Sequence, residues 1–339
     1  MINKEVLSKI GISRPRELSE ERLMGCFVSV TQEFKGQEFL MSYKGRGFLV
    51  RGDITAIKGR AKSGKTCYLS VLVATVLNGK FAGFGALVKD LKVLYIDTEQ
   101  SLSNTQRIIK KALRMAGLPE QDNKRILPFN LREFTAEERT QALEMLVENS
   151  KPDIVIIDGI RDLLVDFNDI KESHYLISLL MKITKVFQCA LIAVLHENKA
   201  DQNMRGHAGT ELTNKSSEVY QVSRSGDDER SFYKVTQTDT RNLPIDEAFT
   251  FQIGEDGLPQ EVFVASPLTP SEKRKNTITE NFNRFMEPGT SLTYTKLISS
   301  YMEATGLAEA TAKKHLPEAM DLGILIKNGD EYSRRIYMV

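Results

Sequence analysis

One short stretch constrains the fold of this chain more than any other. The residues "ITAIKGRAKSGKTCYLSVLVATVL", 54 to 77, place an apolar, β-prone run before a glycine-rich turn and an apolar periodic run after it. The turn follows the pattern G-x-x-x-x-G-K-[ST], filled by Gly59, Gly64, Lys65 and Thr66. Between a strand and a helix, this pattern is typical of a phosphate-binding loop. We therefore expect a binding site for ATP or GTP here.

The loop also predicts which atoms hold the nucleotide. Its backbone N–H groups can curl around phosphates, and the following helix adds the positive end of its dipole. Lys65 is expected to reach the β- and γ-phosphates, and Thr66 is expected to bind Mg²⁺. The predicted nucleotide-binding residues are Gly59, Arg60, Ala61, Lys62, Ser63, Gly64, Lys65, Thr66 and Cys67. ATP and Mg²⁺ are the predicted cofactors.

From Gly52 onward, apolar strands alternate with amphipathic helices. Strands are expected at 54–59, 92–97, 153–158 and 189–196, and helices from Thr66, near 101–116 and near 173–188. Apolar strands separated by helices indicate a parallel sheet that is covered on both faces. Three later runs, 217–225, 231–238 and 248–254, alternate like edge hairpins that extend the same sheet. We expect an α/β fold with a mostly parallel sheet.

Composition shifts divide the chain. Residues 1–45 form a segment of uncertain structure with a helix expected in "ELSEERLMGCFVSVTQEF", and residues 46–265 form the nucleotide-binding domain. Two prolines among Ser, Thr and Lys predict a linker at 266–277. Residues 278–339 contain three expected helices and then two β-prone runs around Asn328-Gly329, a strong hairpin signal. This order predicts a small winged helix-turn-helix domain, in which Pro317 should bend the third helix.

Two carboxylates are candidates for the chemistry. Asp158 closes the apolar run "DIVIID", where an acidic side chain can bind the Mg²⁺ of a nucleotide. Glu99 stands just past the run "KVLYID", where a carboxylate can orient the water that attacks the γ-phosphate. The alternatives are an aspartate that caps a loop and a solvated loop glutamate.

These segments resemble a known family. "YIDTEQS" resembles the element that supplies the catalytic glutamate of RecA-like ATPases, and "VIIDGIRDLL" resembles their Walker B strand. In the AAA+ class the glutamate instead directly follows the Walker B aspartate, and that position here is Gly159. The resemblance covers roughly residues 50–255 and implies a RecA-like P-loop NTPase core with Glu99 as the catalytic base. In "LIAVLHENK", His196 takes the γ-phosphate sensor position of the RepA/DnaB-type hexameric helicases.

The same resemblance implies contacts with DNA. The loop after His196 corresponds to the DNA-contacting loop of these helicases, and Lys199, Arg205 and His207 give it positive charge. An ordinary surface loop is the alternative.

The resemblance also implies a ring of subunits. "SFYKVTQTDTRNLP" is similar to the segment in which ring helicases carry a K-x-R-x-G element. Arg241 matches the arginine that reaches the ATP of the neighbouring subunit, whereas Asp239 and Leu243 replace the lysine and the glycine. The implied assembly is a hexameric ring.

The C-terminal domain carries further basic residues. Lys313 and Lys314 lie in its third expected helix, and Arg334 and Arg335 lie in its expected wing, so a winged helix could place all four against DNA. Residues 271–339 nevertheless balance ten basic against nine acidic side chains, so their field is weak. A protein-docking role stays open.

Composition limits the other possibilities. Forty-six Lys and Arg against 45 Asp and Glu give a formal charge of +1, so no global field draws the chain to DNA or a membrane. Three cysteines without metal-ligand spacing, and no apolar run long enough to span a bilayer, indicate a reduced, cytoplasmic protein.

The sequence thus predicts Mg²⁺-dependent ATP hydrolysis coupled to binding or unwinding of single-stranded or forked DNA. The expected setting is replication or mobilisation of a plasmid or mobile element, with a DNA helicase as the candidate enzyme. One alternative is an ATP-switch regulator or loader that does not unwind DNA. Another is an ATPase whose winged helix docks a protein.

Overall fold

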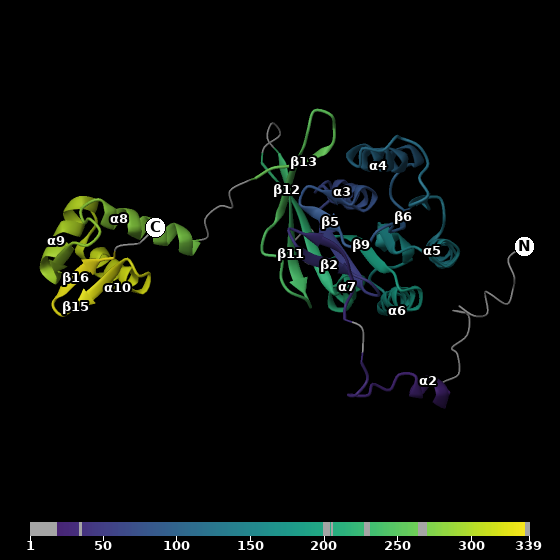
Figure 1. The fold of residues 1–339 in the computed structure, drawn as a ribbon, viewed down its shortest axis with the longest axis horizontal. Helices are drawn as coiled ribbons and strands as arrows, with labels where there is room; N and C mark the ends of the chain where they lie inside the picture. Colours follow the sequence, from purple (N-terminus) through teal and green to yellow (C-terminus); the bar gives the residue numbers. More distant parts are fainter. Residues whose placement is uncertain are drawn as a thin grey trace, which may run out of the picture. The chain divides into compact units, whose positions relative to one another are not determined.

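The computed structural model describes residues 19–33, 36–198, 204, 206–226, 231–263 and 270–335. The chain divides into two compact units, Met1–Phe263 and Val264–Val339 (Figure 1). No helix within the described residues is both long and apolar enough to cross a membrane.

A nine-stranded sheet forms the centre of the first unit. In order across the sheet, its strands are β13 (Pro259–Glu261), β12 (Phe249–Ile253), β11 (Phe232–Thr240), β10 (Glu218–Ser225), β3 (Ile54–Gly59), β9 (Ala190–His196), β8 (Ile154–Asp158), β6 (Val93–Asp97) and β7 (Ile126–Asn130). Neighbouring strands run parallel from β10 to β7, and β11, β12 and β13 add antiparallel partners at one edge. The expected α/β fold with a large, mostly parallel sheet, as in a RecA-like P-loop core, is confirmed.

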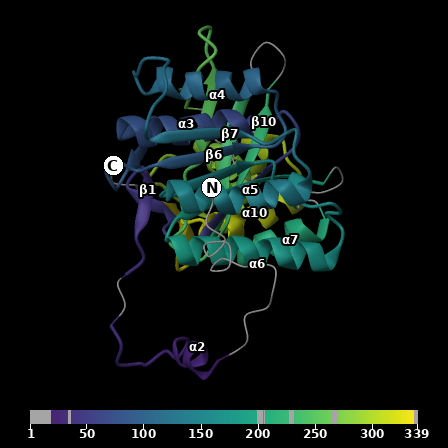
Figure 2. The ribbon, with the colours of Figure 1, turned by 90° about the vertical axis from the view of Figure 1, so that its right-hand side faces the viewer.

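Helices cover both faces of this sheet because its inner strands are apolar on both sides. Every residue of β3, β6 and β8 is buried. One face is covered by α3 (Lys65–Asn78) and α4 (Leu102–Met115), the other by α5 (Ala136–Ser150), α6 (Ile170–Phe187) and α7 (Gly206–Lys215) (Figure 2). A short 3₁₀ helix, η1 (Ile160–Leu163), follows β8. The carboxyl ends of the parallel strands therefore meet at one edge of a rigid, two-sided core.

A second, four-stranded sheet packs on the α3 face. Its order is β2 (Arg46–Val50), β1 (Phe39–Tyr43), β5 (Phe84–Ala86) and β4 (Lys80–Phe81). Leu40, Met41 and Phe48 join the same buried cluster as the residues of α3. β1 lies inside the segment 1–45, for which the sequence predicted no strand. These strands are short, and they are stabilised by distant contacts rather than by a strong local pattern.

The N-terminal helix predicted in residues 17–34 is short. Within the described part of residues 17–34, only α2 (Glu20–Met24) is helical. Gly25 follows the helix, and Phe27 and Val28 beyond it are exposed. A helix this short gains its stability from packing, and α2 has exposed apolar side chains instead. The helix predicted in this stretch is thus present as α2, and it ends at Met24.

The second unit contains three helices and a three-stranded sheet. Its elements are α8 (Pro270–Asn283), β14 (Ser291–Thr293), α9 (Tyr294–Thr305), α10 (Glu309–Asp321), β15 (Leu325–Asn328) and β16 (Glu331–Arg334). The pairing of Asn328 with Glu331 confirms the predicted hairpin. α8 begins at Pro270, inside the predicted linker 266–277, because proline is favoured in the first turn of a helix. α10 continues through Pro317.

Candidate active site

The phosphate-binding loop joins β3 to α3, and its two glycines have no room for side chains. A Cβ on Gly59 would lie 2.3 Å from the carbonyl oxygen of Val222. Gly64 has φ of 95°, and a Cβ there would lie 2.5 Å from the ring of Tyr233. A positive φ and such close approach both favour glycine. The antiparallel strands β10 and β11 thus hold the loop in place from outside.

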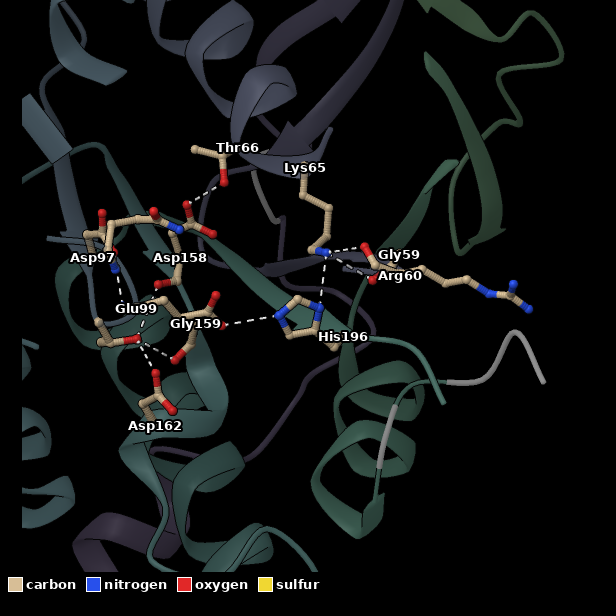
Figure 3. Close-up of polar contacts among 12 residues, drawn as sticks. Gly59, Arg60, Lys65, Thr66, Asp97, Glu99, Asp158, Gly159, Asp162 and His196 are labelled. Atoms are coloured by element: carbon tan, nitrogen blue, oxygen red, sulfur yellow. Dashed lines mark hydrogen bonds and ion pairs between the residues drawn. The ribbon is translucent and has the colours of Figure 1, made fainter. Parts of the chain in front are cut away.

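Three predicted residues, Lys65, His196 and Glu99, meet at the carboxyl edge of the sheet (Figure 3). Lys65 Nζ donates hydrogen bonds to the carbonyl oxygens of Gly59, at 2.9 Å, and Arg60, at 2.8 Å. It also lies 3.2 Å from Nδ1 of His196. Because an ammonium group only donates, Nδ1 accepts and the neutral ring carries its proton on Nε2. Nε2 in turn lies 3.4 Å from Glu99 Oε1.

The two charged partners of His196 have shifted pKa values. The hydrogen bond from His196 lowers the pKa of Glu99, which keeps this carboxylate ionised and able to accept a hydrogen bond. Burial lowers the pKa of Lys65. Three elements, α3, β9 and the end of β6, therefore bring a cation, an imidazole and a carboxylate into one chain of contacts.

Asp158 lies at the end of β8 and is 5% exposed. Its Oδ2 accepts hydrogen bonds from Thr66 Oγ1 at 3.0 Å and from the Tyr95 hydroxyl at 2.9 Å. Burial and the nearby Asp97 raise the pKa of Asp158 to about 6. Two neighbouring buried carboxylates are costly unless a cation compensates them. This arrangement suits a cation held at Asp158.

The residues of the loop fit a nucleotide with Mg²⁺. The hydroxyl of Ser63 is buried in the loop and has no hydrogen-bond partner among the described residues. The oxygens of Thr66 and Asp158 are the hard ligands that Mg²⁺ prefers. Within the described part of the chain, no group of three or more His, Cys, Asp or Glu side chains could hold a metal alone. The remaining ligands would come from the phosphates and from water, as is usual for this ion.

Gly159 shows why the candidate base is not on β8. Its φ is 106°, and a Cβ there would lie 2.3 Å from Thr98 Oγ1 and 2.8 Å from Glu99 Cγ. No side chain fits at Gly159, because Glu99 from the neighbouring strand occupies that space. Asp97 and Asp158 are paired across β6 and β8, so Glu99 comes directly beside the Walker B end.

Sequence reasoning missed the residues that hold Glu99. Asp97 Oδ1 accepts the backbone N–H groups of Glu99, at 3.0 Å, and Gln100, at 2.9 Å. Its Oδ2 accepts the hydroxyl proton of Thr105 at 2.7 Å. The signal in the sequence was an aspartate two residues before the candidate base, at the end of an apolar strand. Tyr95, inside the same strand, gave no signal because an aromatic residue there is ordinary core.

The other predicted loop residues surround this centre. Arg60, Ala61 and Lys62 are exposed. Cys67 and Thr66 line a cavity of about 170 Å³ together with residues of α4. The other lining residues are Ser70, Gln100, Asn104, Arg107, Ile108 and Lys111.

Arg241 lies at the opposite end of the sheet from its own phosphate-binding loop. It follows Thr240, which pairs with Glu218, and Glu218 pairs with Thr55 near the start of β3. The Arg241 Nη2 atom donates to the carbonyl oxygen of Asn214 at 2.6 Å. The structure therefore does not bring Arg241 to the other predicted site residues of the same chain.

The predicted DNA contacts are dispersed. Lys199 and Arg205 lie outside the described residues, and His207 is exposed on α7. In the second unit, Lys313 pairs with Glu309 at 2.7 Å. Arg334 donates to Met286 and Asn283, whereas Lys314 and Arg335 are exposed.

Known proteins that are similar to this chain identify its family. Residues 31–202, just over half of the chain, match the family model described as AAA domain. Among solved structures, this chain is similar to a KaiC-like protein from Pyrococcus horikoshii OT3, with 12% sequence identity and a TM-score of 0.45. The alignment covers 63% of this chain and 92% of the KaiC-like protein. A search of the curated proteins returns no match. The chain belongs to the AAA domain family and is a P-loop ATPase.

Proposed function

We propose that this chain hydrolyses ATP with Mg²⁺ and that Glu99 orients the attacking water. The observation that carries this proposal is the position of Glu99, which fills the space beside Gly159. From there it lies within 3.4 Å of the His196 ring that also contacts Lys65. A base that is ionised, partly exposed and next to the phosphate-binding lysine suits in-line attack on a γ-phosphate.

Each residue then has a role of its own. Bound Mg²⁺, held by Thr66 and Asp158, supplies positive charge that stabilises the charge developing on the transferred phosphoryl group. Lys65 exchanges the carbonyl oxygens of Gly59 and Arg60 for phosphate oxygens, so His196 Nδ1 loses its donor. Glu99 accepts the hydrogen bond of the water and holds it in line. His196 thereby senses whether the γ-phosphate is present.

We further propose that hydrolysis is coupled to DNA through the segment after His196. Glu197 forms an isolated antiparallel bridge with Met204 and accepts a hydrogen bond from Gln221 at 2.6 Å. A movement of His196 therefore reaches both the start and the end of the intervening loop. The work on DNA, the hexameric ring and the role in replication or mobilisation of a plasmid or mobile element are supported by the resemblance to RepA/DnaB-type helicases.

A second candidate function concerns the C-terminal unit, which we propose is a winged helix. The internal contacts of Lys313 and Arg334 favour a protein-docking role over DNA binding, because these cations are already engaged. The double substitution Lys314→Glu and Arg335→Glu in the full chain separates the two roles. A fall in DNA affinity supports DNA contact, and an unchanged affinity supports protein docking.

The main test compares two substitutions with an exposed control, Glu133→Gln. Lys65→Ala should abolish nucleotide binding, because the phosphates lose their main cation. Glu99→Gln should bind ATP but hydrolyse it about 10²–10⁴-fold more slowly. Nucleotide binding and ATPase rates are measured with and without single-stranded DNA, whose stimulation of the wild type tests the coupling. Wild-type turnover in Glu99→Gln would show that the base is elsewhere.

A further inference from the structure

Tyr95 is a core residue of β6 with one polar contact that sets it apart. Its side chain is 0% exposed, and its hydroxyl donates to Oδ2 of Asp158 at 2.9 Å. If Tyr95 were buried for packing alone, a phenylalanine would serve equally well, because its ring fills nearly the same volume. A phenol remains protonated at neutral pH and can therefore act as a fixed hydrogen-bond donor. The contact joins the interior of the sheet to the predicted Mg²⁺ ligand.

Asp158 uses only one of its two carboxylate oxygens for these contacts. Thr66 Oγ1 and the Tyr95 hydroxyl both donate to Oδ2. Among the described residues, no side chain or backbone group donates to Oδ1. Oδ1 is also not among the buried polar atoms that lack a partner, so it is accessible. One oxygen is thus held by the protein and the other is left open.

The two donors to Oδ2 differ in whether they take part in nucleotide binding. Thr66 is itself a predicted Mg²⁺ ligand at the start of α3, so its hydroxyl takes part in binding. Tyr95 belongs to a fully buried strand and has no predicted contact with nucleotide. It can therefore hold the Asp158 carboxylate in the same orientation with and without ligand. Groups that hold a metal ligand in this way usually tune metal affinity.

We propose that Tyr95 is a positioning residue for the Mg²⁺ site, whose hydroxyl fixes the carboxylate of Asp158 with Oδ1 open toward the cation or its water. This inference rests on the proposed function, because it concerns the same Mg²⁺-dependent site. It adds a residue that touches neither nucleotide nor metal. Its consequence is a specific loss of Mg²⁺ affinity when the hydroxyl is removed.

The chain contains a matched control for this bond. Tyr220 donates to Oε2 of Glu218 at 3.0 Å, and both residues are buried. Glu218 pairs with Thr55, at the end of β3 remote from the phosphate-binding loop. Tyr220→Phe therefore removes a bond between a phenol and a carboxylate away from the site, together with the bond that Gln237 Nε2 donates to the Tyr220 hydroxyl at 3.1 Å. Any effect common to both tyrosines reflects lost stability rather than Mg²⁺ binding.

The experiment uses full-length wild type, Tyr95→Phe and Tyr220→Phe. Binding of a fluorescent ATP analogue is titrated with Mg²⁺ and repeated in excess chelator, and kcat is measured at saturating Mg²⁺. Thermal unfolding without ligand confirms that each variant is folded. For Tyr95→Phe, the Mg²⁺ concentration at half-saturation should rise about 10–100-fold. Analogue binding in chelator and kcat at saturating Mg²⁺ should stay near the wild-type values.

The outcomes separate the inference from the function on which it rests. If the wild type binds the analogue equally with Mg²⁺ and in chelator, the proposed Mg²⁺ dependence fails, and the role of Tyr95 fails with it. If the wild type needs Mg²⁺ and Tyr95→Phe has the same titration curve, only the role of Tyr95 is overturned. An equal shift in Tyr220→Phe also overturns it. If Tyr95→Phe is unfolded at the assay temperature, the titrations of all three proteins are repeated at a lower temperature at which it is folded; a curve that still shifts supports the role of Tyr95, and a wild-type curve overturns it.

Discussion

Two hydrogen bonds between a tyrosine and a carboxylate lie on different strands of the central sheet, one toward the carboxyl ends of its parallel strands and one toward their amino ends. At the carboxyl end, Tyr95 and Thr66 both donate to Oδ2 of Asp158 and leave Oδ1 open. At the amino end, Glu218 accepts hydrogen bonds at both of its carboxylate oxygens. The local chemistry is the same, but only one of the two carboxylates has an oxygen available to bind a ligand.

The pair formed by Tyr220 and Glu218 has a structural role. Glu218 Oε2 accepts the Tyr220 hydroxyl and the backbone N–H of Leu49, and Oε1 accepts the Asn242 side chain. These contacts tie the four-stranded sheet and the turn after β11 to the central sheet. Burial raises the pKa of Glu218, just as it raises that of Asp158. A raised pKa alone therefore does not distinguish the site from the scaffold, whereas the open oxygen does.

The largest expected effect tests whether the amino end of the sheet contributes a residue to the ATP site of a neighbouring subunit. Arg241 lies at this end, away from its own loop, so in the proposed ring it would complete the site of a neighbouring subunit, and Arg241→Ala should lower ATPase activity about 10³–10⁵-fold. Lys65→Ala alone should be equally inactive. In a one-to-one mixture that forms a head-to-tail ring, roughly a quarter of interfaces combine a good loop with a good arginine, and ATPase activity should reappear.

This mixing experiment needs proof that subunits exchange, for which energy transfer between labelled chains is suitable. A mixture that exchanges and stays inactive would exclude Arg241 as a trans-acting residue. The reason would then be that Asp239 and Leu243 stand where the K-x-R-x-G element has its lysine and its glycine.

The next largest effect sharpens the contrast between the two carboxylates. Glu218→Ala should lower the free energy of unfolding by about 2–4 kcal/mol, because the buried donors of Tyr220 and Leu49 and the half-buried donor of Asn242 lose their acceptor. The Mg²⁺-dependent ATPase rate per folded molecule should stay close to that of the wild type. Urea unfolding and ATPase assays below the melting temperature measure the two quantities. A selective loss of kcat in a stable variant would contradict the structural role.

The smallest expected effect is a gain in the free energy of unfolding, and it depends on pH. The pKa of Asp158 in the folded chain is about 6, above the roughly 3.9 of an unfolded aspartate. Ionisation of Asp158 therefore opposes folding, with no cost below about pH 4 and the full cost above about pH 6. Without Mg²⁺ and nucleotide, Asp158→Asn should raise the free energy of unfolding at pH 7.5 by about 1–3 kcal/mol, while Mg²⁺-dependent hydrolysis is lost.

At pH 4 most of this gain in stability should disappear, because Asp158 is then protonated in the folded chain and only about half ionised in the unfolded chain. Urea unfolding at the two pH values measures the difference. A variant that is less stable than the wild type at pH 7.5 would show that the hydrogen bonds to Asp158 outweigh its burial.

The sequence by itself determined the parts of this protein that depend on local patterns. The phosphate-binding loop, the apolar strands with their helices and the Asn328-Gly329 hairpin follow from glycine geometry and from the spacing of apolar residues. The apolar runs also indicated that Asp158 closes one strand and that Glu99 stands just past the end of another. These features were predictable because each is encoded within a few consecutive residues.

Only the tertiary structure decided how distant residues meet. The register of β6 against β8 places Asp97 opposite Asp158, and the same register leaves Gly159 no space beside Glu99. The direction of β11 carries Arg241 away from its own phosphate-binding loop. The bond from Tyr95 to Asp158 could not be predicted, because 63 residues separate them and Tyr95 resembles an ordinary core residue. Strand pairing across such distances depends on the packing of the whole sheet, which no local pattern contains.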